Sequence, residues 1–132
     1  MTVVIRHIRH SFAVMALPVS LQSSHHSRRR YQQLVAQEAA KSVSTPIQDQ
    51  EKVRIEIDWF SQGFHNRPDV DNIAKPIIDA LKGILFTDDK QVESYTVKKH
   101  STLGPIQFWR EPLSIVEPLL AGSSDYVFVR VY

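Results

Sequence analysis

The middle of the chain changes from a two-residue to a helical repeat of apolar side chains, and this change constrains the fold more than any other feature. In segment 53–59 apolar residues alternate with polar ones, which predicts a half-buried strand. From residue 70 or 71 to Lys82 the repeat becomes helical, with Gly83 placed to end the helix. Its predicted buried positions are Ile73, Ile77, Ile78 and Leu81. Pro76 falls just after the first turn, so the start is expected to be kinked or shifted toward Asn72.

Several other segments complete the predicted architecture. Strands are expected at 12–19, 92–100 and 126–132, with a helix over 28–42 capped by Ser27 and a short helix at 112–120. This order predicts an α+β fold: a single small domain over residues 1–132, in which two main helices pack on a mixed β-sheet. Residues 1–10 are interpreted as a flexible arm, 20–27 as a mobile loop and 104–124 as an insertion.

Composition excludes several classes of protein. The 132 residues suffice for one core, and the absence of cysteine excludes disulfides, zinc-thiolate sites and thiol nucleophiles. The apolar run at 12–19 is shorter than the roughly 20 residues that span a bilayer. We therefore expect a soluble cytoplasmic protein with no membrane partner. A net charge of +2 is a weak indication of a polyanionic partner.

Two carboxylates, Asp69 and Asp71, stand where the central helix is predicted to begin. In an extended segment residues two positions apart share a face, and Pro68 keeps the residue before it out of a helix. Carboxylates about 5 Å apart repel by roughly 1 kcal/mol in water and by more at a protein surface, and a bound cation relieves this repulsion. Oxygen ligands suit Mg²⁺ or Mn²⁺. The pattern favours metal-assisted phosphoryl chemistry; the alternative is that Asp71 caps the helix and Asp69 is solvated.

Three further positions bear on this site. Lys75 is four residues from both Asp71 and Asp79, so it either joins a surface ion-pair ladder or places a cation beside the metal. Asn72 either supports a ligand carboxylate by hydrogen bonding or is an ordinary polar residue of the first turn. The pair Asp88-Asp89 is a solvated turn, unless the chain returns it to the start of the helix as a further ligand.

Basic residues mark a candidate surface for phosphates. Arg28, Arg29 and Arg30 are predicted to begin a helix, where cations oppose the macrodipole unless a phosphate docks there. The alternative is a solvated basic turn. Arg67, Lys98 and Lys99 would extend the same basic track around the acidic site.

With these residues assembled, the chain resembles the RusA family of Holliday junction resolvases. The resemblance is carried by Arg67-Pro-Asp69-Val-Asp71-Asn72-Ile-Ala-Lys75-Pro-Ile-Ile-Asp79-Ala-Leu81 and by Asp88-Asp89-Lys90-Gln91-Val92. Weaker agreement at Pro18-Val19-Ser20 and in the helix containing Tyr31 extends it over roughly residues 13–100.

The resemblance implies a homodimeric, Mg²⁺-dependent crossover junction endodeoxyribonuclease of DNA recombination and repair, with Mn²⁺ able to substitute. Such an enzyme nicks two opposed strands of four-way DNA and leaves 5′-phosphate and 3′-hydroxyl ends. By the resemblance, Asp69, Asp71 and Asp89 match the metal-binding acidic residues and Lys75 the catalytic lysine. Asp88 precedes the matching residue and would assist it.

Two departures leave other functions open. Segment 22–27 lacks the lysines and arginines often found there in relatives, and segment 104–124 is foreign to the pattern. One alternative is a branched-DNA-binding protein that has lost turnover. Another is a metal-dependent phosphohydrolase that acts on flap DNA or nucleotides.

Overall fold

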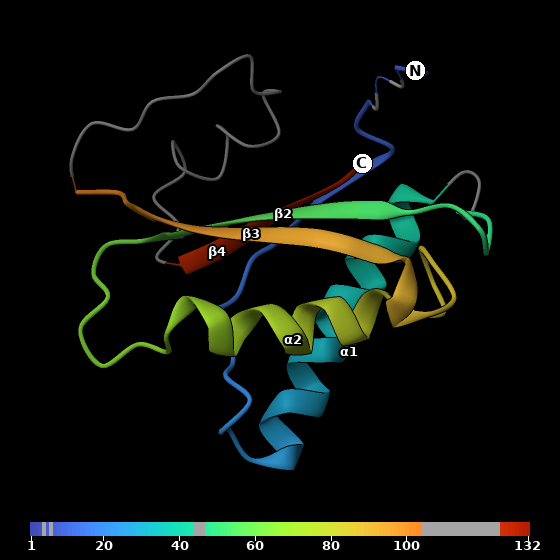
Figure 1. The fold of residues 1–132 in the computed structure, drawn as a ribbon. Helices are drawn as coiled ribbons and strands as arrows, with labels where there is room; N and C mark the ends of the chain where they lie inside the picture. Colours follow the sequence, from blue (N-terminus) through green and yellow to red (C-terminus); the bar gives the residue numbers. More distant parts are fainter. Residues whose placement is uncertain (4, 6, 44–46, 104–124) are drawn as a thin grey trace.

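Two helices cover one face of a four-stranded sheet in the computed structural model, which describes residues 1–3, 5, 7–43, 47–103 and 125–132. The strands are β1 (His10–Val14), β2 (Val53–Ser61), β3 (Val92–Ser101) and β4 (Asp125–Val131). The helices are α1 (His25–Ser42) and α2 (Val70–Leu81), and a single 3-10 turn, η1, follows at Asp89–Gln91. Figure 1 shows both α-helices on the same side of the sheet. The predicted α+β class is confirmed.

The strand order β1-β4-β2-β3 makes the sheet mixed and places β3 at one edge. β4 pairs antiparallel with both β1 and β2, whereas β2 and β3 run parallel. A parallel pair needs a crossover connection, and α2 provides it between β2 and β3. Consequently α2 runs back along the sheet, starting beside the end of β2 and finishing beside the start of β3 (Figure 1).

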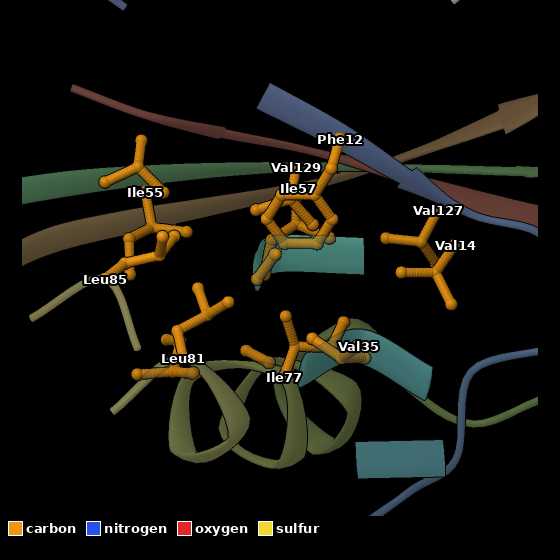
Figure 2. Close-up of a cluster of buried hydrophobic side chains, with 14 of the residues drawn as sticks. Phe12, Val14, Val35, Ile55, Ile57, Ile77, Leu81, Leu85, Val127 and Val129 are labelled. Carbon is orange, nitrogen blue, oxygen red and sulfur yellow. The ribbon is translucent and has the colours of Figure 1, made fainter. Parts of the chain in front are cut away.

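The main core lies between the sheet and the helices, and Phe60, Tyr126 and Phe128 form a smaller separate cluster. Figure 2 shows Phe12, Ile57 and Val129 on the sheet side, facing Val35 and Ile77 on the helix side. Full burial of an aliphatic side chain of this size contributes roughly 1.5–3 kcal/mol. All four positions predicted as the buried face of α2 are buried, namely Ile73, Ile77, Ile78 and Leu81. This burial holds the start and the end of α2 in fixed positions against the sheet.

Helix α1 begins one turn earlier than expected, because Ser24 rather than Ser27 caps it. The Ser27 N–H donates to the Ser24 hydroxyl at 3.1 Å. The last residues of the predicted mobile loop 20–27 therefore belong to the helix, and that part of the prediction is wrong. Leu34, expected on the buried face, is 41% exposed.

Pro76 neither delays nor shortens α2, which starts at Val70. Proline has no N–H, so the carbonyl of Asn72, four residues earlier, has no intrahelical donor from that position. The N–H of Leu21 supplies one instead, at 3.0 Å. Pro76 thus leaves an acceptor that ties the segment before α1 to the first turn of α2.

The strands differ from expectation mainly at their ends. β1 is shorter than the predicted 12–19 and, within the described sheet, pairs with β4 from His10 opposite Val131 to Val14 opposite Val127. His10 therefore lies in the sheet and not in the predicted arm. The segment 104–124 and the helix expected at 112–120 lie outside the described residues. Within the residues that are described, no helix is both long and apolar enough to cross a membrane.

Candidate functional site

The carboxylates of Asp69 and Asp71 are exposed at the start of α2, and helix capping uses neither. Asp69 is the N-cap residue in an extended conformation (φ −75°, ψ 155°), but its side chain makes no capping hydrogen bond. Asp71 lies in the first turn. Among the described residues, none donates a hydrogen bond to either carboxylate. The alternative in which Asp71 caps the helix is wrong, and both groups are available to a ligand.

The loop before Asp69 is held at several points. Phe64 packs edge-on against Trp59, with ring centroids 5.0 Å apart. The N–H of Arg67 donates to the Phe64 carbonyl at 3.1 Å, and Asn66 takes the positive φ of 56° that this tight turn requires. Arg67, a predicted DNA contact, lies 3.5 Å from a carboxylate oxygen of Asp125. These contacts fix the direction in which the chain enters α2.

Lys75 pairs with one of the two carboxylates that share its helix face. Its ammonium lies 3.1 Å from Asp79 Oδ1, and its side chain is 59% exposed. A solvent-exposed helical pair of this kind contributes only about 0.3–0.5 kcal/mol. The weak pair leaves Lys75 able to move to a stronger partner, such as a phosphate.

The neighbouring carboxylates Asp88 and Asp89 have different roles. Asp88 caps η1 by accepting a hydrogen bond from the Lys90 N–H at 3.0 Å. That hydrogen bond lowers the pKa of Asp88 below its usual value, and the charges of Lys82 and Lys90 lower it further. Asp89 is exposed, with the Lys82 ammonium 3.8 Å from its Oδ2. The fold itself therefore uses Asp88, whereas Asp89 remains accessible to a ligand.

A single chain does not bring Asp89 to Asp69 and Asp71. Because α2 runs back along the sheet, the turn just before β3 lies at the C-terminal end of α2, opposite the end where Asp69 lies (Figure 1). No three histidine, aspartate or glutamate side chains within the described residues are placed to hold a metal ion. The return of Asp88-Asp89 to the start of the helix, which the sequence left open, does not occur within one chain.

An open pocket of about 480 Å³ joins Lys75 to Asp89. It lies between α2 and the first half of β3, and it is lined by Lys75, Ile78, Asp79, Asp89, Val92, Glu93, Ser94 and Tyr95. Two predicted site residues from different elements therefore share one surface depression.

The predicted basic track is divided between several surfaces. Arg28, Arg29 and Arg30 lie about one turn into α1 rather than at its start, and the latter two are exposed. Lys98 and Lys99 are neighbours on β3, so their side chains point to opposite faces of the sheet. The Lys99 ammonium lies 5.5 Å from the Trp59 ring and 5.1 Å from the Phe64 ring. Lys99 thus lies beside the loop that leads to Asp69.

Comparison with known proteins assigns the chain to a family. The family model described as Endodeoxyribonuclease RusA matches residues 22–106, more than half of the chain. The chain belongs to the RusA endodeoxyribonuclease family. The matched region contains Asp69, Asp71, Lys75 and Asp89. No curated protein matches the chain.

Sequence reasoning missed two residues that lie next to the candidate site. Lys82, the C-cap of α2, places a cation beside Asp89, and only the turn geometry reveals that proximity. Gln91 is 3% exposed and forms the second half of a capping box with Asp88. An Asp followed three residues later by Gln resembles the capping-box pattern, so this signal was readable in the sequence.

Proposed function

We propose that this RusA-family protein is a Mg²⁺-dependent endonuclease that resolves Holliday junctions by paired, symmetric nicks during recombination and repair in the cytoplasm. One observation carries the proposal: the paired carboxylates of Asp69 and Asp71 are exposed, carry no capping bond and lie in the family-matched segment. Two neighbouring carboxylates repel each other, and a bound cation would relieve that repulsion.

The carboxylate oxygens of the candidate site are suitable ligands for Mg²⁺. Carboxylate oxygens are the ligands that Mg²⁺ and Mn²⁺ prefer, and Mg²⁺ typically takes one or two of them together with water and phosphate oxygens. Asp69 and Asp71 would hold the ion, with Asp89 as the third carboxylate. When bound, the cation supplies Lewis acidity toward the phosphate and lowers the pKa of a coordinated water.

A homodimer supplies the third carboxylate that one chain cannot. Helix α2 has 12 residues. At 1.5 Å per residue its two ends are about 18 Å apart. Ligands of one Mg²⁺ lie about 2.1 Å from it, so carboxylates at opposite ends of α2 cannot share an ion. Asp89 of a second copy, related by a twofold axis, can approach the start of α2 if the two helices run antiparallel.

Within the described residues β3 is the outer strand of the sheet, and its edge is the surface that we assign to such a twofold contact. In the described sheet β3 pairs only with β2, and all ten of its residues are exposed or half-buried. Its start follows Asp89, and its end adjoins the end of β2, where the Thr102 N–H donates to the Ser61 carbonyl at 2.9 Å. Antiparallel pairing of two β3 edges would therefore place Asp89 of one copy toward Asp69 and Asp71 of the other. Two such sites related by twofold symmetry suit a four-way junction.

The chain's own residues account for the remaining steps. Lys75 gives up its weak pair with Asp79 and donates to the scissile phosphate, where its charge offsets the negative charge that develops as water attacks phosphorus. Asn72 would support Asp71, and Asp88 would hold Asp89 through the turn rather than by ligation. The products carry 5′-phosphate and 3′-hydroxyl ends.

The test is cleavage of a labelled mobile four-way junction beside a linear duplex of the same sequence, each with Mg²⁺ and with EDTA. We expect paired symmetric nicks on the junction alone, lost in EDTA. Tight binding without cuts in any metal would favour a branched-DNA-binding protein. Cleavage restricted to flap DNA or nucleotides would favour a different phosphohydrolase.

Arg29→Ala is expected to weaken junction binding without changing the chemistry of the site. Arg29 is exposed on α1, and loss of one charged hydrogen bond to a phosphate costs about 1.5 kcal/mol, or roughly tenfold in Kd. The slope of log K against log salt should fall by about one for each phosphate that the protein no longer neutralises. Titration of EDTA-treated protein at several salt concentrations measures both quantities.

Lys41→Ala is the matched control for this arginine. Lys41 lies in the last turn of the same helix and is 72% exposed, so its removal changes the net charge equally at a distant position. It should bind the junction like wild type. If the salt slope of Arg29→Ala is the same as that of wild type, Arg29 does not contact a phosphate, and the arginines form a solvated basic surface.

A further inference from the structure

We propose that Gln91 is the positioning residue for Asp89, an inference that rests on the proposed metal-dependent nuclease function. Asp89 is exposed, and its side chain has only the Lys82 ammonium at 3.8 Å as a near partner within the described part of the chain. Its direction is therefore set by the backbone of the turn at 87–91, and a buried amide at the end of that turn controls this backbone.

The amide oxygen of Gln91 holds the entry to the turn. It accepts hydrogen bonds from the N–H groups of Thr87 at 2.8 Å and Asp88 at 3.0 Å. The Thr87 hydroxyl lies 2.8 Å from the same oxygen and 2.9 Å from Asp49 Oδ1, so its single proton is shared between two acceptors. The two residues immediately before Asp89 are thereby fixed to one atom.

The amide nitrogen of Gln91 ties the turn to a separate part of the chain. It donates to the carbonyls of Gln48 at 2.8 Å and Glu51 at 3.0 Å. Both protons of the NH₂ group and both acceptor positions of the oxygen are thus in use. A buried amide that is satisfied on all sides rigidifies its surroundings, and one that is partly satisfied is costly.

The backbone N–H of Gln91 closes the turn that contains Asp89. Its own N–H donates to the Asp88 carbonyl at 3.0 Å, which closes the 3-10 turn over Asp89. Asp88, by capping the same turn through the Lys90 N–H, adds a third constraint. The residues before Asp89 are therefore held by the Gln91 side chain and the residue after it by the Asp88 side chain, while the carboxylate of Asp89 stays exposed. This is the arrangement expected of a residue that supports a metal ligand without touching the metal.

Gln91→Met tests the proposal, because it keeps the length of the side chain and removes every hydrogen bond of the amide. Removing a residue that orients a metal ligand typically costs about 10–100-fold in metal affinity. We expect the Mg²⁺ concentration for half-maximal junction cleavage to rise by that factor. Calorimetric titration of the DNA-free protein with Mn²⁺ should show the same weakening, whereas junction affinity in EDTA should be unchanged.

Two further variants separate positioning from general destabilisation. Gln91→Glu keeps the acceptor oxygen but loses the donors, so its metal requirement should fall between those of wild type and Gln91→Met. Ile57→Val removes a methylene from the core at a site on β2 that contacts no part of this turn through hydrogen bonds, and it typically costs about 0.5–1.5 kcal/mol. It should lower the melting temperature without changing the metal requirement. Both Gln91 variants are assayed below their measured melting temperatures.

The outcomes distinguish this inference from the function on which it rests. If wild-type protein cleaves junctions with Mg²⁺ and a folded Gln91 variant shows the wild-type metal requirement and Mn²⁺ affinity, the positioning role is overturned and the nuclease function stands. If wild-type protein neither cleaves DNA nor binds Mn²⁺, the proposed function is wrong, and the positioning role of Gln91, which rests on it, is wrong as well.

Discussion

Asp71→Asn is expected to abolish cleavage of a four-way junction while leaving junction binding intact. The substitution keeps the shape of the side chain but removes the negative charge that would hold the metal. If the bound ion supplies about 4 kcal/mol of transition-state stabilisation, its loss lowers the rate about 10³-fold. Binding depends on phosphate contacts made by cations elsewhere, so the affinity measured in EDTA should not fall. Removing one of two neighbouring negative charges should, if anything, strengthen it.

Single-turnover cleavage with saturating protein measures the first quantity, and titration of labelled junction measures the second. Glu38→Gln is the matched control, since Glu38 is an acidic residue on α1 that pairs with Lys41 at 2.9 Å. It should cleave like wild type. Because Asp71 is exposed in the first turn, Asp71→Asn should lose only the favourable interaction with the helix dipole, about 0.3–1 kcal/mol. An active Asp71→Asn protein would remove this residue from the site and with it the basis of the metal proposal.

The sequence predicted those parts of the fold that depend on local periodicity. The alternation over 53–59 and the helical repeat ending at Leu81 correspond to β2 and α2. The expected alternation of burial holds only in the first half of β2, because every residue from Ile57 to Ser61 is buried. The early start of α1 was missed because Ser24 and Ser27 are equally good caps by residue type. Pro76 was expected to disturb α2, and the Leu21 N–H that compensates for it comes from a distant segment.

The exposure of the candidate carboxylates Asp69 and Asp71 was predictable from the sequence, whereas the position of Asp89 relative to them was not. The exposed carboxylates of Asp69 and Asp71 follow from a loop that enters the helix in an extended conformation. Nothing in the spacing of Asp88 and Asp89 indicates that the turn lies at the far end of α2. That position follows from the parallel pairing of β2 with β3, which is a property of the whole sheet. Within one chain, parallel pairing therefore keeps Asp89 at the opposite end of α2 from Asp69 and Asp71.

This arrangement leads to the second prediction, in which two inactive variants restore activity when they are mixed. If each site takes Asp69 and Asp71 from one copy and Asp89 from the other, Asp71→Asn and Asp89→Asn should each inactivate both sites of a homodimer. In a mixed dimer, both substitutions fall in the same site. The other site then contains only native carboxylates. We therefore expect cleavage to reappear after the two proteins are unfolded together and refolded, as nicks in one strand rather than in two opposed strands.

The mixing experiment discriminates between the two possible arrangements because a site contained within one chain gives the opposite result. In that case each chain of the mixed dimer carries its own defective site, and no native set of carboxylates forms. Refolding each variant alone controls for contamination by active protein. Mixing Asp71→Asn with Asp69→Asn is the sharper control, since both defects lie at the same end of α2. In that mixture each shared site keeps one defective carboxylate, so cleavage should stay absent. Cleavage restored by the first mixture and not by the second would assign Asp89 to the opposite subunit. Absence of cleavage in both mixtures would instead place all three carboxylates of a site in one chain. That arrangement would require α2 and its flanking turns to rearrange.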